Sequence, residues 1–180
     1  MIPLLYEEGK ITIRKLQEKD KVYLVKWLST PAVLEFYEGR DKPYDLQMVE
    51  YDFYQRENDV EKCMVEYEGE RIGYIQFYKV NEHTSEIKDF RGKGITYGID
   101  QFIGETAYWN KGIGTLLVSS MVQYLTQVKK ADRVIMDPKT TNIRALRCYE
   151  KCGFEKVRIL PKHEFHEGEY HDCWLIEYVK

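Results

Sequence analysis

The sequence predicts an α+β domain built on a mixed β-sheet. Three observations support this class: some segments have the apolar spacing of strands, others have the spacing of helices, and a glycine-rich turn joins a strand to a helix. The expected order is strand, two or three helices, three strands, helix, strand, helix and two strands. With 180 residues and 43% apolar content, one domain over residues 1–180 can bury a sizeable core.

The first half of the chain is expected to hold an edge strand, helices and a strand pair. Residues 21–28 carry the apolar stripe of an amphipathic helix. Residues 68–70 are a hairpin turn signal between two segments rich in β-branched and aromatic residues. The expected elements are a strand over 11–16, helices over 19–29, 32–37 and 46–55, and strands over 60–67 and 71–80.

The second half is expected to alternate strands and helices before it ends in a strand pair. Gly153 suits the left-handed residue that follows a helix. Residues 81–93 are expected to be irregular, and residues 161–172 are expected to form a loop. The expected elements are a strand over 95–103, a helix over 113–129, a strand over 133–137, a helix over 142–152, and strands over 155–160 and 173–179.

The turn over residues 109–115 is the most informative segment, because it carries two glycines and opens a helix. Backbone N–H groups at a helix start lack helical partners and carry the positive end of the helix dipole, and glycines let an anion approach closely. Alone, this turn could serve only the fold. A second short helix over residues 142–154 ends in a glycine and an aromatic residue, and together the two segments predict one phosphate-bearing cofactor site.

Charge and cysteine content narrow the class of protein. A net charge of −3 and a pI near 5.9 argue against a nucleic-acid partner and suit a cationic ligand. The sequence shows no long apolar run and no N-terminal signal pattern, so we expect no membrane partner and a cytoplasmic location. The four cysteines have no CxxC spacing, and we expect reduced thiols and no metal site.

Several segments resemble the GNAT superfamily of N-acetyltransferases, among them Lys111–Thr115 and Asn142–Phe154. Gly98–Gln101 and the last third of the chain are similar to the aminoglycoside 6'-N-acetyltransferases of resistant bacteria, in particular to the acetyltransferase half of a bifunctional acetyltransferase and phosphotransferase. The resemblance implies a GNAT fold, with a mostly antiparallel central sheet, a splayed parallel strand pair and helices on both faces. Trp109 departs from the family pattern, which usually has Gln or Arg there.

By this resemblance, acetyl-CoA (coenzyme A) is the co-substrate. Its pyrophosphate is expected on backbone N–H groups of the turn, where Lys111 can add a positive charge. Its pantetheine arm is expected along the strand that ends near residue 103, and Asn142 can bind this arm while it caps its helix. The implied cofactor-binding residues are Phe102, Ile103, Lys111, Gly112, Ile113, Gly114, Thr115, Asn142 and Lys151.

Asp100 and Tyr149 are the expected catalytic residues. Asp100 interrupts an apolar strand, where an ionised carboxylate is costly unless it has a partner. It can orient an amine and accept the amine's proton as the new bond forms, or it can merely bond a loop. The resemblance places the hydroxyl of Tyr149 near the CoA sulfur, where it can protonate the departing thiolate, although an aromatic residue at helical spacing can also be core.

Acidic residues dominate the expected acceptor side. Residues 163–172 hold four acids and no Lys or Arg, which favours a polycationic ligand, with a solvated loop as the alternative. The three histidines of this segment match no zinc spacing. The expected substrate-binding residues are Trp27, Glu35, Tyr37, Asp41, Asp100, Asp137, Glu164, Glu167 and Asp172.

The resemblance implies transfer of acetyl to the 6'-amine of an aminoglycoside such as kanamycin, by direct attack in a ternary complex, which gives antibiotic resistance. Two alternatives stay open: acetylation of a protein N-terminus or a polyamine, and a sensor that binds acyl-CoA or drug without turnover. We expect a monomer or a weak dimer. The sequence leaves open the drug spectrum, transfer to hydroxyl groups and fusion to a kinase domain.

Overall fold

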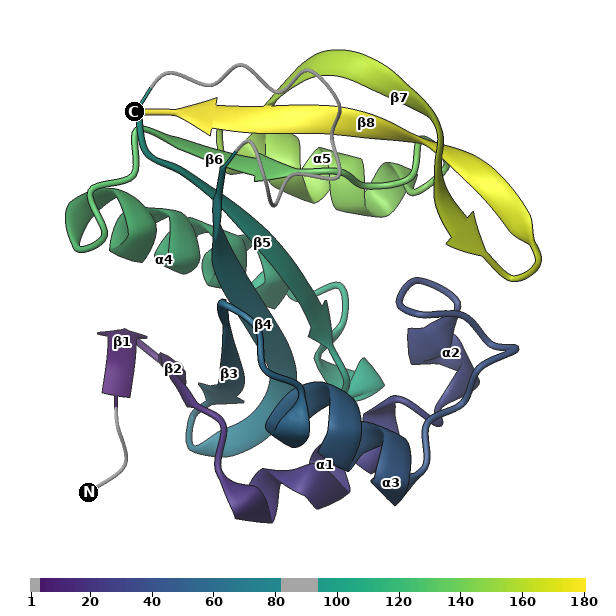
Figure 1. The fold of residues 1–180 in the computed structure, drawn as a ribbon. Coiled ribbons are helices and arrows are strands. Elements are labelled where there is room, and N and C mark those ends of the chain that lie inside the picture. Colours follow the sequence, from purple (N-terminus) through teal and green to yellow (C-terminus); the bar gives the residue numbers. More distant parts are fainter. Residues whose placement is uncertain (1–3, 82–93) are drawn as a thin grey trace. The chain divides into compact units, whose positions relative to one another are not determined.

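The computed structural model describes residues 4–81 and 94–180. Its strands form a mixed sheet in the order β1-β2-β3-β4-β5-β6-β8-β7 (Figure 1). The pairs β1–β2, β2–β3, β6–β8 and β7–β8 are antiparallel, whereas β5 and β6 are parallel. The strands are β1 (Leu4–Glu8), β2 (Ile11–Lys15), β3 (Val60–Tyr67), β4 (Glu70–Val80), β5 (Thr96–Ile103), β6 (Arg133–Met136), β7 (Glu155–His166) and β8 (Glu169–Val179).

Five α-helices and three short helical segments of other types connect the strands within the described residues. The α-helices are α1 (Lys21–Trp27), α2 (Pro31–Leu34), α3 (Leu46–Val49), α4 (Ile113–Gln127) and α5 (Ile143–Lys151). The 3-10 segments are η1 (Glu18–Asp20) and η3 (Thr106–Tyr108), and η2 (Glu50–Gln55) is a π-helix. The mixed α+β class predicted from the sequence is confirmed.

The chain packs as two compact units. The first holds residues 1–76 and 101–114, and the second holds residues 77–100 and 115–180. Strands β4 and β5 contribute residues to both units, and the chain passes between the units again after Gly114. A single domain over residues 1–180 therefore stays a prediction.

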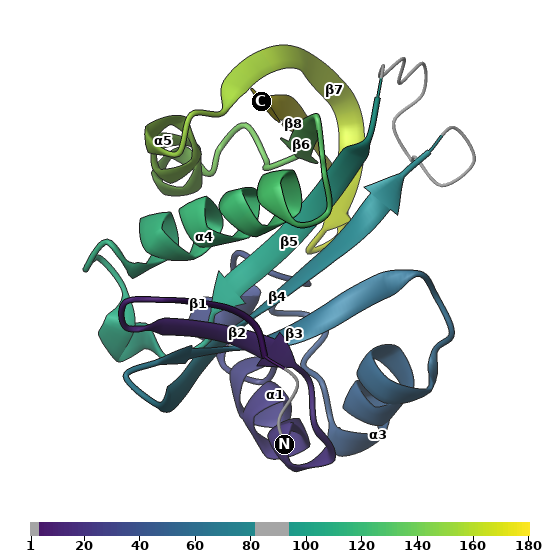
Figure 2. The ribbon, with the colours of Figure 1, turned by 90° about the vertical axis from the view of Figure 1, so that its left-hand side faces the viewer.

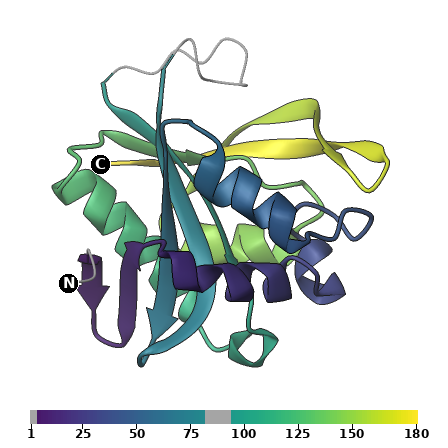
Figure 3. The same ribbon diagram turned by 60° about the horizontal axis from the view of Figure 1, so that its bottom comes forward.

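The first unit has an aromatic core at the end of α1, which lies beside α3 (Figure 3). Trp27 is fully buried, and its ring lies edge-on to that of Phe102, with 6.2 Å between centroids. Phe102 also packs against Tyr37 and Tyr74, with centroid distances of 4.7 and 5.6 Å. Aromatic contacts of this kind add to the hydrophobic gain from burial, so they fix α1 against the end of β5.

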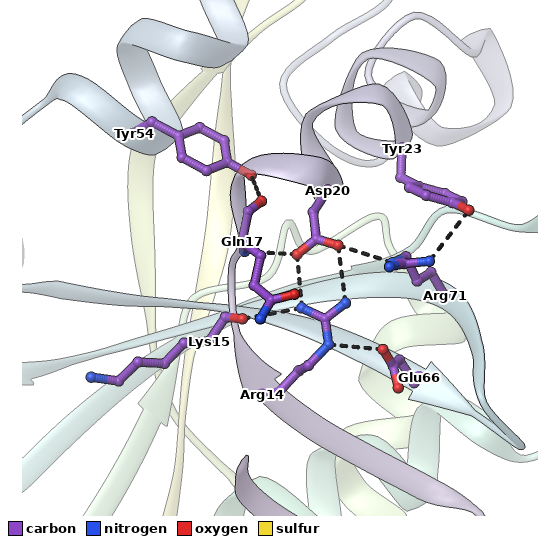
Figure 4. A network of polar contacts seen from close by, with 8 residues as sticks. All are labelled: Arg14, Lys15, Gln17, Asp20, Tyr23, Tyr54, Glu66 and Arg71. Carbon is purple, nitrogen blue, oxygen red and sulfur yellow. Dashed lines mark hydrogen bonds and ion pairs between the residues drawn. The ribbon is translucent and has the colours of Figure 1, made fainter. Parts of the chain in front are cut away.

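A buried ion network holds the start of α1 (Figure 4). Arg14 on β2 donates hydrogen bonds of 2.8 and 3.0 Å to Asp20 and one of 2.8 Å to Glu66. Arg71 and the backbone N–H of Gln17 also donate to Asp20, at 2.9 and 2.8 Å. Burial raises the pKa of Asp20, but these hydrogen bonds outweigh burial and hold the pKa below its usual value. The carboxylate, which is 0% exposed, thus stays ionised although it is buried.

The second unit places α4 and α5 side by side (Figures 1 and 2), and hydrogen bonds between the two helices hold them together. Strands β7 and β8 form a long hairpin that turns at Glu167 and Gly168, which have φ values of 50° and 85°. Apolar side chains of β6, β7 and β8 form a core with Val80. Its other buried members are Ile135, Leu160, Cys173 and Leu175.

Local signals in the sequence predicted several elements correctly. Strand β5 and helix α4 lie where expected. Asn142 caps α5, because its Oδ1 accepts a hydrogen bond of 3.4 Å from the backbone N–H of Ala145. Gly153 follows that helix with a φ of 95°, as predicted. The hairpin turn between β3 and β4 contains Glu68 and Gly69 at φ values of 49° and 81°.

The prediction of a loop over residues 161–172 is wrong. β7 continues to His166 and β8 begins at Glu169, so most of these residues are paired. Pro161 hid the strand, because proline in a sheet is confined to edges and bulges, and the register of β7 and β8 shifts between Leu160 and Glu164. The irregularity also contains Lys162, with a φ of 46°.

Smaller differences concern the N-terminal half. The helix predicted over residues 32–37 ends at Leu34, and the one predicted over 46–55 changes from α to π winding at Glu50. Strand β1 was not predicted, and it pairs with β2 through an irregular register. Of the residues predicted to be irregular, 82–93 lie outside the described residues.

Candidate active site

The predicted phosphate turn has an open backbone. Asn110 and Gly112 have positive φ values of 59° and 76°, and α4 begins at the next residue, Ile113. Lys111 and Gly112 are exposed, and a Cβ placed on Gly112 would meet no atom within 4 Å. The turn therefore fits a phosphate group, which can approach N–H groups at the helix start. The side chain of Ile113 is buried, so only its backbone can serve a ligand.

The end of β5 is bent by a bulge at Gly104 and Glu105. Both of their N–H groups point to the carbonyl of Ile72, at 2.8 and 3.1 Å. A Cβ on Gly104 would overlap the indole ring of Trp27, so only glycine lets this ring lie on the strand. The bulge ends the strand and redirects the chain toward η3 and the phosphate turn.

Glu105 joins this bulge to α1. Its carboxylate accepts hydrogen bonds from the indole N–H of Trp27 at 2.9 Å and from Lys26 at 2.7 Å. Burial raises the pKa of Glu105, but these two donors prevail and lower it below its usual value. Trp27 is 0% exposed, and its predicted contact with a substrate stays a prediction. Its role in this structure is to support the strand end.

Trp109, the residue that departs from the family pattern, links the turn to the same strand end. Its indole N–H donates a 2.8 Å hydrogen bond to the carbonyl of Ile103. Its ring meets the ring of Phe36 in a T-shaped contact with 6.3 Å between centroids. Among the predicted acceptor residues of this unit, Tyr37 is half-buried against Phe102, and Glu35 and Asp41 are exposed. Their substrate contacts stay predictions.

Asp100 lies on β5 within the second unit and is half-buried. The parallel register with β6 covers residues 96–98 of this strand, so Asp100 lies two residues beyond it. A Cβ on Gly98 would come within 2.5 Å of the ring of Tyr78, so this glycine lets an aromatic ring lie directly on the strand just before Asp100. The strand backbone that carries the expected catalytic carboxylate is thereby closely packed.

Helix α5 carries the other residues expected to meet acetyl-CoA. The Oδ1 of Asn142 serves the helix cap, as one half of its predicted double role requires. Tyr149 is half-buried, and its ring lies 6.3 Å from that of Phe154, so it contributes to packing as well. Lys151 is exposed on the last turn of the helix.

Two predicted acceptor carboxylates gather around Cys173. The thiol donates to Oε2 of Glu164 at 3.8 Å. Burial, followed by the negative charges of Glu164 and Asp137, raises the pKa of Cys173 to about 12. The other two acids belong to the hairpin itself: Asp172 accepts a 2.9 Å hydrogen bond from the N–H of Lys162, and Glu167 lies at the turn.

The contact between His163 and Asp137 was not predicted from the sequence. Its Nε2 lies 2.7 Å from Oδ2 of Asp137, the residue that follows β6. The irregular register after Pro161 precedes this histidine on β7. The proline was the available signal, because proline within a strand marks a bulge, and bulges redirect side chains.

Metal and membrane features are absent from the described part of the chain. No group of three or more His, Cys, Asp or Glu side chains there could hold a metal ion. Among the helices of residues 4–81 and 94–180, none is long and apolar enough to span a membrane.

A family model described as an acetyltransferase (GNAT) domain matches residues 17–161. The chain belongs to the GNAT acetyltransferase family. This GNAT protein is 30% identical over 150 residues to the aminoglycoside N(6')-acetyltransferase type 1 of Klebsiella pneumoniae. The aligned residues cover 81% of this chain and 74% of that protein. It is 42% identical over 59 residues to a kanamycin resistance protein of Rhizobium radiobacter, over 33% of this chain and 55% of that protein.

Solved structures agree with the assignment to the GNAT family. The aminoglycoside acetyltransferase AAC(6')-Ib in complex with ribostamycin and coenzyme A has a TM-score of 0.77 and 27% identity, over 96% of this chain and 94% of that one. A ribosomal L7/L12 α-N-protein acetyltransferase with 11% identity and a TM-score of 0.79, over 98% of this chain and 97% of that one, shares the fold alone. The chain is thus an acetyl-CoA-dependent N-acetyltransferase.

Proposed function

We propose that this GNAT enzyme transfers acetyl from acetyl-CoA to the 6'-amine of aminoglycoside antibiotics. The observation that carries the proposal is the similarity, over most of both chains, to an aminoglycoside N(6')-acetyltransferase. A polycationic acceptor is further supported by Asp137 and Glu164, because the negative charges of both carboxylates act on the same residue, Cys173. An acidic surface raises the local concentration of a cationic ligand and speeds its encounter.

Acetyl-CoA is proposed to bind along the turn and the adjoining strand end. Backbone N–H groups from Lys111 to Thr115 would hold the pyrophosphate, and the exposed Lys111 and Lys151 would add positive charge. Backbone groups at Phe102 and Ile103 would bind the pantetheine arm, with Asn142 as a further contact. The open φ geometry of the turn supports this assignment.

Asp100 is proposed to orient the acceptor amine and to receive its proton as the amine attacks the thioester carbonyl. The amine arrives as an ammonium group, which has no free electron pair, and its pKa is several units above that of a carboxyl group. Asp100 can therefore take the proton only as the new C–N bond forms, directly or through water. Tyr149 would give a proton to the CoA sulfur as the C–S bond breaks. Because the amine itself attacks the thioester, the proposed transfer is direct and needs no acyl-enzyme.

On the acceptor side, we propose that Asp137, Glu164, Glu167 and Asp172 of the second unit pair with ammonium groups of the drug. Within the first unit, Glu35, Tyr37 and Asp41 are the proposed acceptor residues. Acetylation removes one ammonium group from the drug. Binding of cations to RNA is largely electrostatic, so the product would bind its RNA target less tightly. Resistance follows from this loss of affinity.

Product analysis with the full chain tests the proposal. Acetyl-CoA is supplied with kanamycin, with a kanamycin analogue that has a hydroxyl in place of the 6'-amine, with spermidine, or with an N-terminal peptide, and products are identified by mass spectrometry. We expect acetylation of kanamycin alone. Turnover on spermidine or the peptide without turnover on kanamycin would overturn the proposed acceptor, and absence of turnover on every amine would favour a sensor.

The catalytic roles are tested by paired variants. Asp100→Asn should lower kcat by about 10²–10⁴-fold and leave the KM for acetyl-CoA unchanged, because it removes only the proton acceptor. Tyr149→Phe should lower kcat by a smaller factor, since a thiolate leaves without much help from a proton donor. Equal losses in kcat and in acetyl-CoA affinity for Asp100→Asn would mean that Asp100 supports the fold.

A further inference from the structure

Tyr78 on β4 lies directly on β5, just before the expected catalytic residue Asp100. A Cβ on Gly98 would come within 2.5 Å of the Cε2 and Cζ atoms of Tyr78 and within 2.7 Å of its hydroxyl oxygen. The hydroxyl end of the phenol therefore fills the space that a side chain at residue 98 would take. The proposed acetyl transfer gives this phenol no role so far.

The phenol of Tyr78 and the side chain of Asp100 share one face of the sheet. Side chains alternate between the two faces of a strand, so Asp100 points to the side on which the phenol lies. Phe77 and Tyr97 point to the other side, where their ring centroids are 6.2 Å apart and Phe77 lies 5.8 Å from Tyr124 of α4. All five residues belong to the second unit, so this arrangement is internal to it.

Asp100 also lies close to the phenol along the strand. Each residue of a strand adds about 3.3 Å, so the Cβ of Asp100 is about 7 Å from the position that the phenol fills at Gly98. The carboxylate extends from this Cβ, and the hydroxyl is the outer end of the phenol. The spacing is therefore within the combined reach of the two side chains, both of which are half-buried.

An apolar core supports the ring of Tyr78. Its members include Ile135 of β6, which is the register partner of Gly98. Apolar neighbours hold the ring in place and keep water from that side of it. The O–H group of a buried phenol usually has a hydrogen-bond partner, and a bond to an ionised acceptor is about twice as strong as a neutral one. Asp100 supplies a carboxylate on this face of β5.

We propose that Tyr78 is a positioning residue for Asp100, a role that rests on the proposed acetyl transfer. Its hydroxyl donates a hydrogen bond to one carboxylate oxygen of Asp100. The other oxygen then holds the acceptor amine and takes its proton as the C–N bond forms, while Tyr78 keeps its own proton. A carboxylate that is already oriented loses less freedom when the amine arrives, which favours the reactive geometry.

Kinetics of the full chain with isosteric variants test this role, using the amine that the unmodified chain acetylates. Tyr78→Phe keeps the ring on Gly98 and removes only the hydroxyl. It should lower kcat by about tenfold or more, the loss expected for one hydrogen bond to a charged group, and leave the KM for acetyl-CoA and the melting temperature unchanged. Tyr97→Phe is the matched control on the opposite face of β5, and it should keep kcat within about twofold.

A double-mutant cycle separates positioning from a general effect on the fold. In a chain that already carries Asp100→Asn, Tyr78→Phe should lower kcat by less than about twofold, because the hydroxyl acts through the carboxylate. An equal loss in both backgrounds, or an unchanged kcat for Tyr78→Phe alone, would overturn the inference.

NMR of the full chain with ¹³C-labelled tyrosine tests the contact without turnover. The Cζ signal of Tyr78, assigned by its loss in Tyr78→Phe, should move in Asp100→Asn. It should stay in place in Glu169→Gln, which changes an exposed acid at the hairpin turn. A Cζ signal that does not respond to Asp100→Asn would contradict the positioning role. Failure of the proposed acceptor would appear instead in the unmodified chain, as turnover of another amine or of none.

Discussion

The imidazole of His163 on β7 lies 2.7 Å from the carboxylate of Asp137, which directly follows β6. The histidine side chain is 13% exposed and the aspartate side chain is 37% exposed, so the imidazole is the inner partner and the carboxylate the outer one. A hydrogen bond at this distance fixes the orientation of the carboxylate. Under the proposed function, His163 is thus a positioning residue for an acceptor-binding acid.

Removing His163 should weaken acceptor binding selectively. His163→Ala is expected to raise the KM for kanamycin by about fivefold to tenfold, because a hydrogen bond of this kind contributes about 1–1.5 kcal/mol. The kcat and the KM for acetyl-CoA should change by less than about twofold. Steady-state kinetics with each substrate varied in turn measure this, and His171→Asn, on the same hairpin, is the control. An unchanged KM for kanamycin would exclude the positioning role.

Asp20 should dominate the stability of the first unit. Asp20→Ala is expected to lower the free energy of unfolding by about 3–5 kcal/mol, because it leaves the buried guanidinium of Arg14 without its main partner. Urea denaturation measures the change. Glu18→Ala, which removes the exposed partner of Lys21, should cost less than about 1 kcal/mol. A loss at Asp20 as small as the loss at Glu18 would show that the network contributes little.

The contacts of Glu105 predict a dependence of stability on pH. The folded state lowers the pKa of Glu105, so its stabilising contribution is complete above the unfolded value, near pH 4.3, and disappears as the pH falls through the folded pKa. Glu105→Gln should therefore lower the melting temperature more at pH 7 than at pH 3. The side chain is 26% exposed, so the contribution at pH 7 is about 1 kcal/mol at most. An equal effect at both pH values would show that shape, and not charge, matters here.

The contact between Gly104 and Trp27 predicts a rescue experiment. Gly104→Ala should destabilise the protein by about 1–3 kcal/mol or more, because the added Cβ overlaps a buried ring. Trp27→Leu in the same chain should recover part of that loss, although it costs stability alone. Gly9→Ala is the control, since its φ of 56° costs about 1 kcal/mol but the space around it is open. Simple addition of the two losses would contradict a direct contact.

Much of the fold could be predicted because its signals are local. The apolar spacing of α4, the glycines of the phosphate turn and the Asn142 cap of α5 each depend on residues within one or two turns of each other. The loop prediction over residues 161–172 failed for a related reason, since Pro161 and several polar residues look like a loop to any local reading. The pairing of β7 with β8 depends on partners across the hairpin, such as Glu164 with His171.

The sequence by itself determined the α+β class, the helix-opening glycine turn and which carboxylates are proposed to meet a cationic acceptor. Only the tertiary structure decided which of them have partners. His163 reaches Asp137 over 26 positions, and Trp27 reaches Glu105 over 78, so both hydrogen bonds depend on strand register and bulges. A shift of one residue in a strand moves every side chain to the opposite face, and periodicity within a single segment does not contain that information.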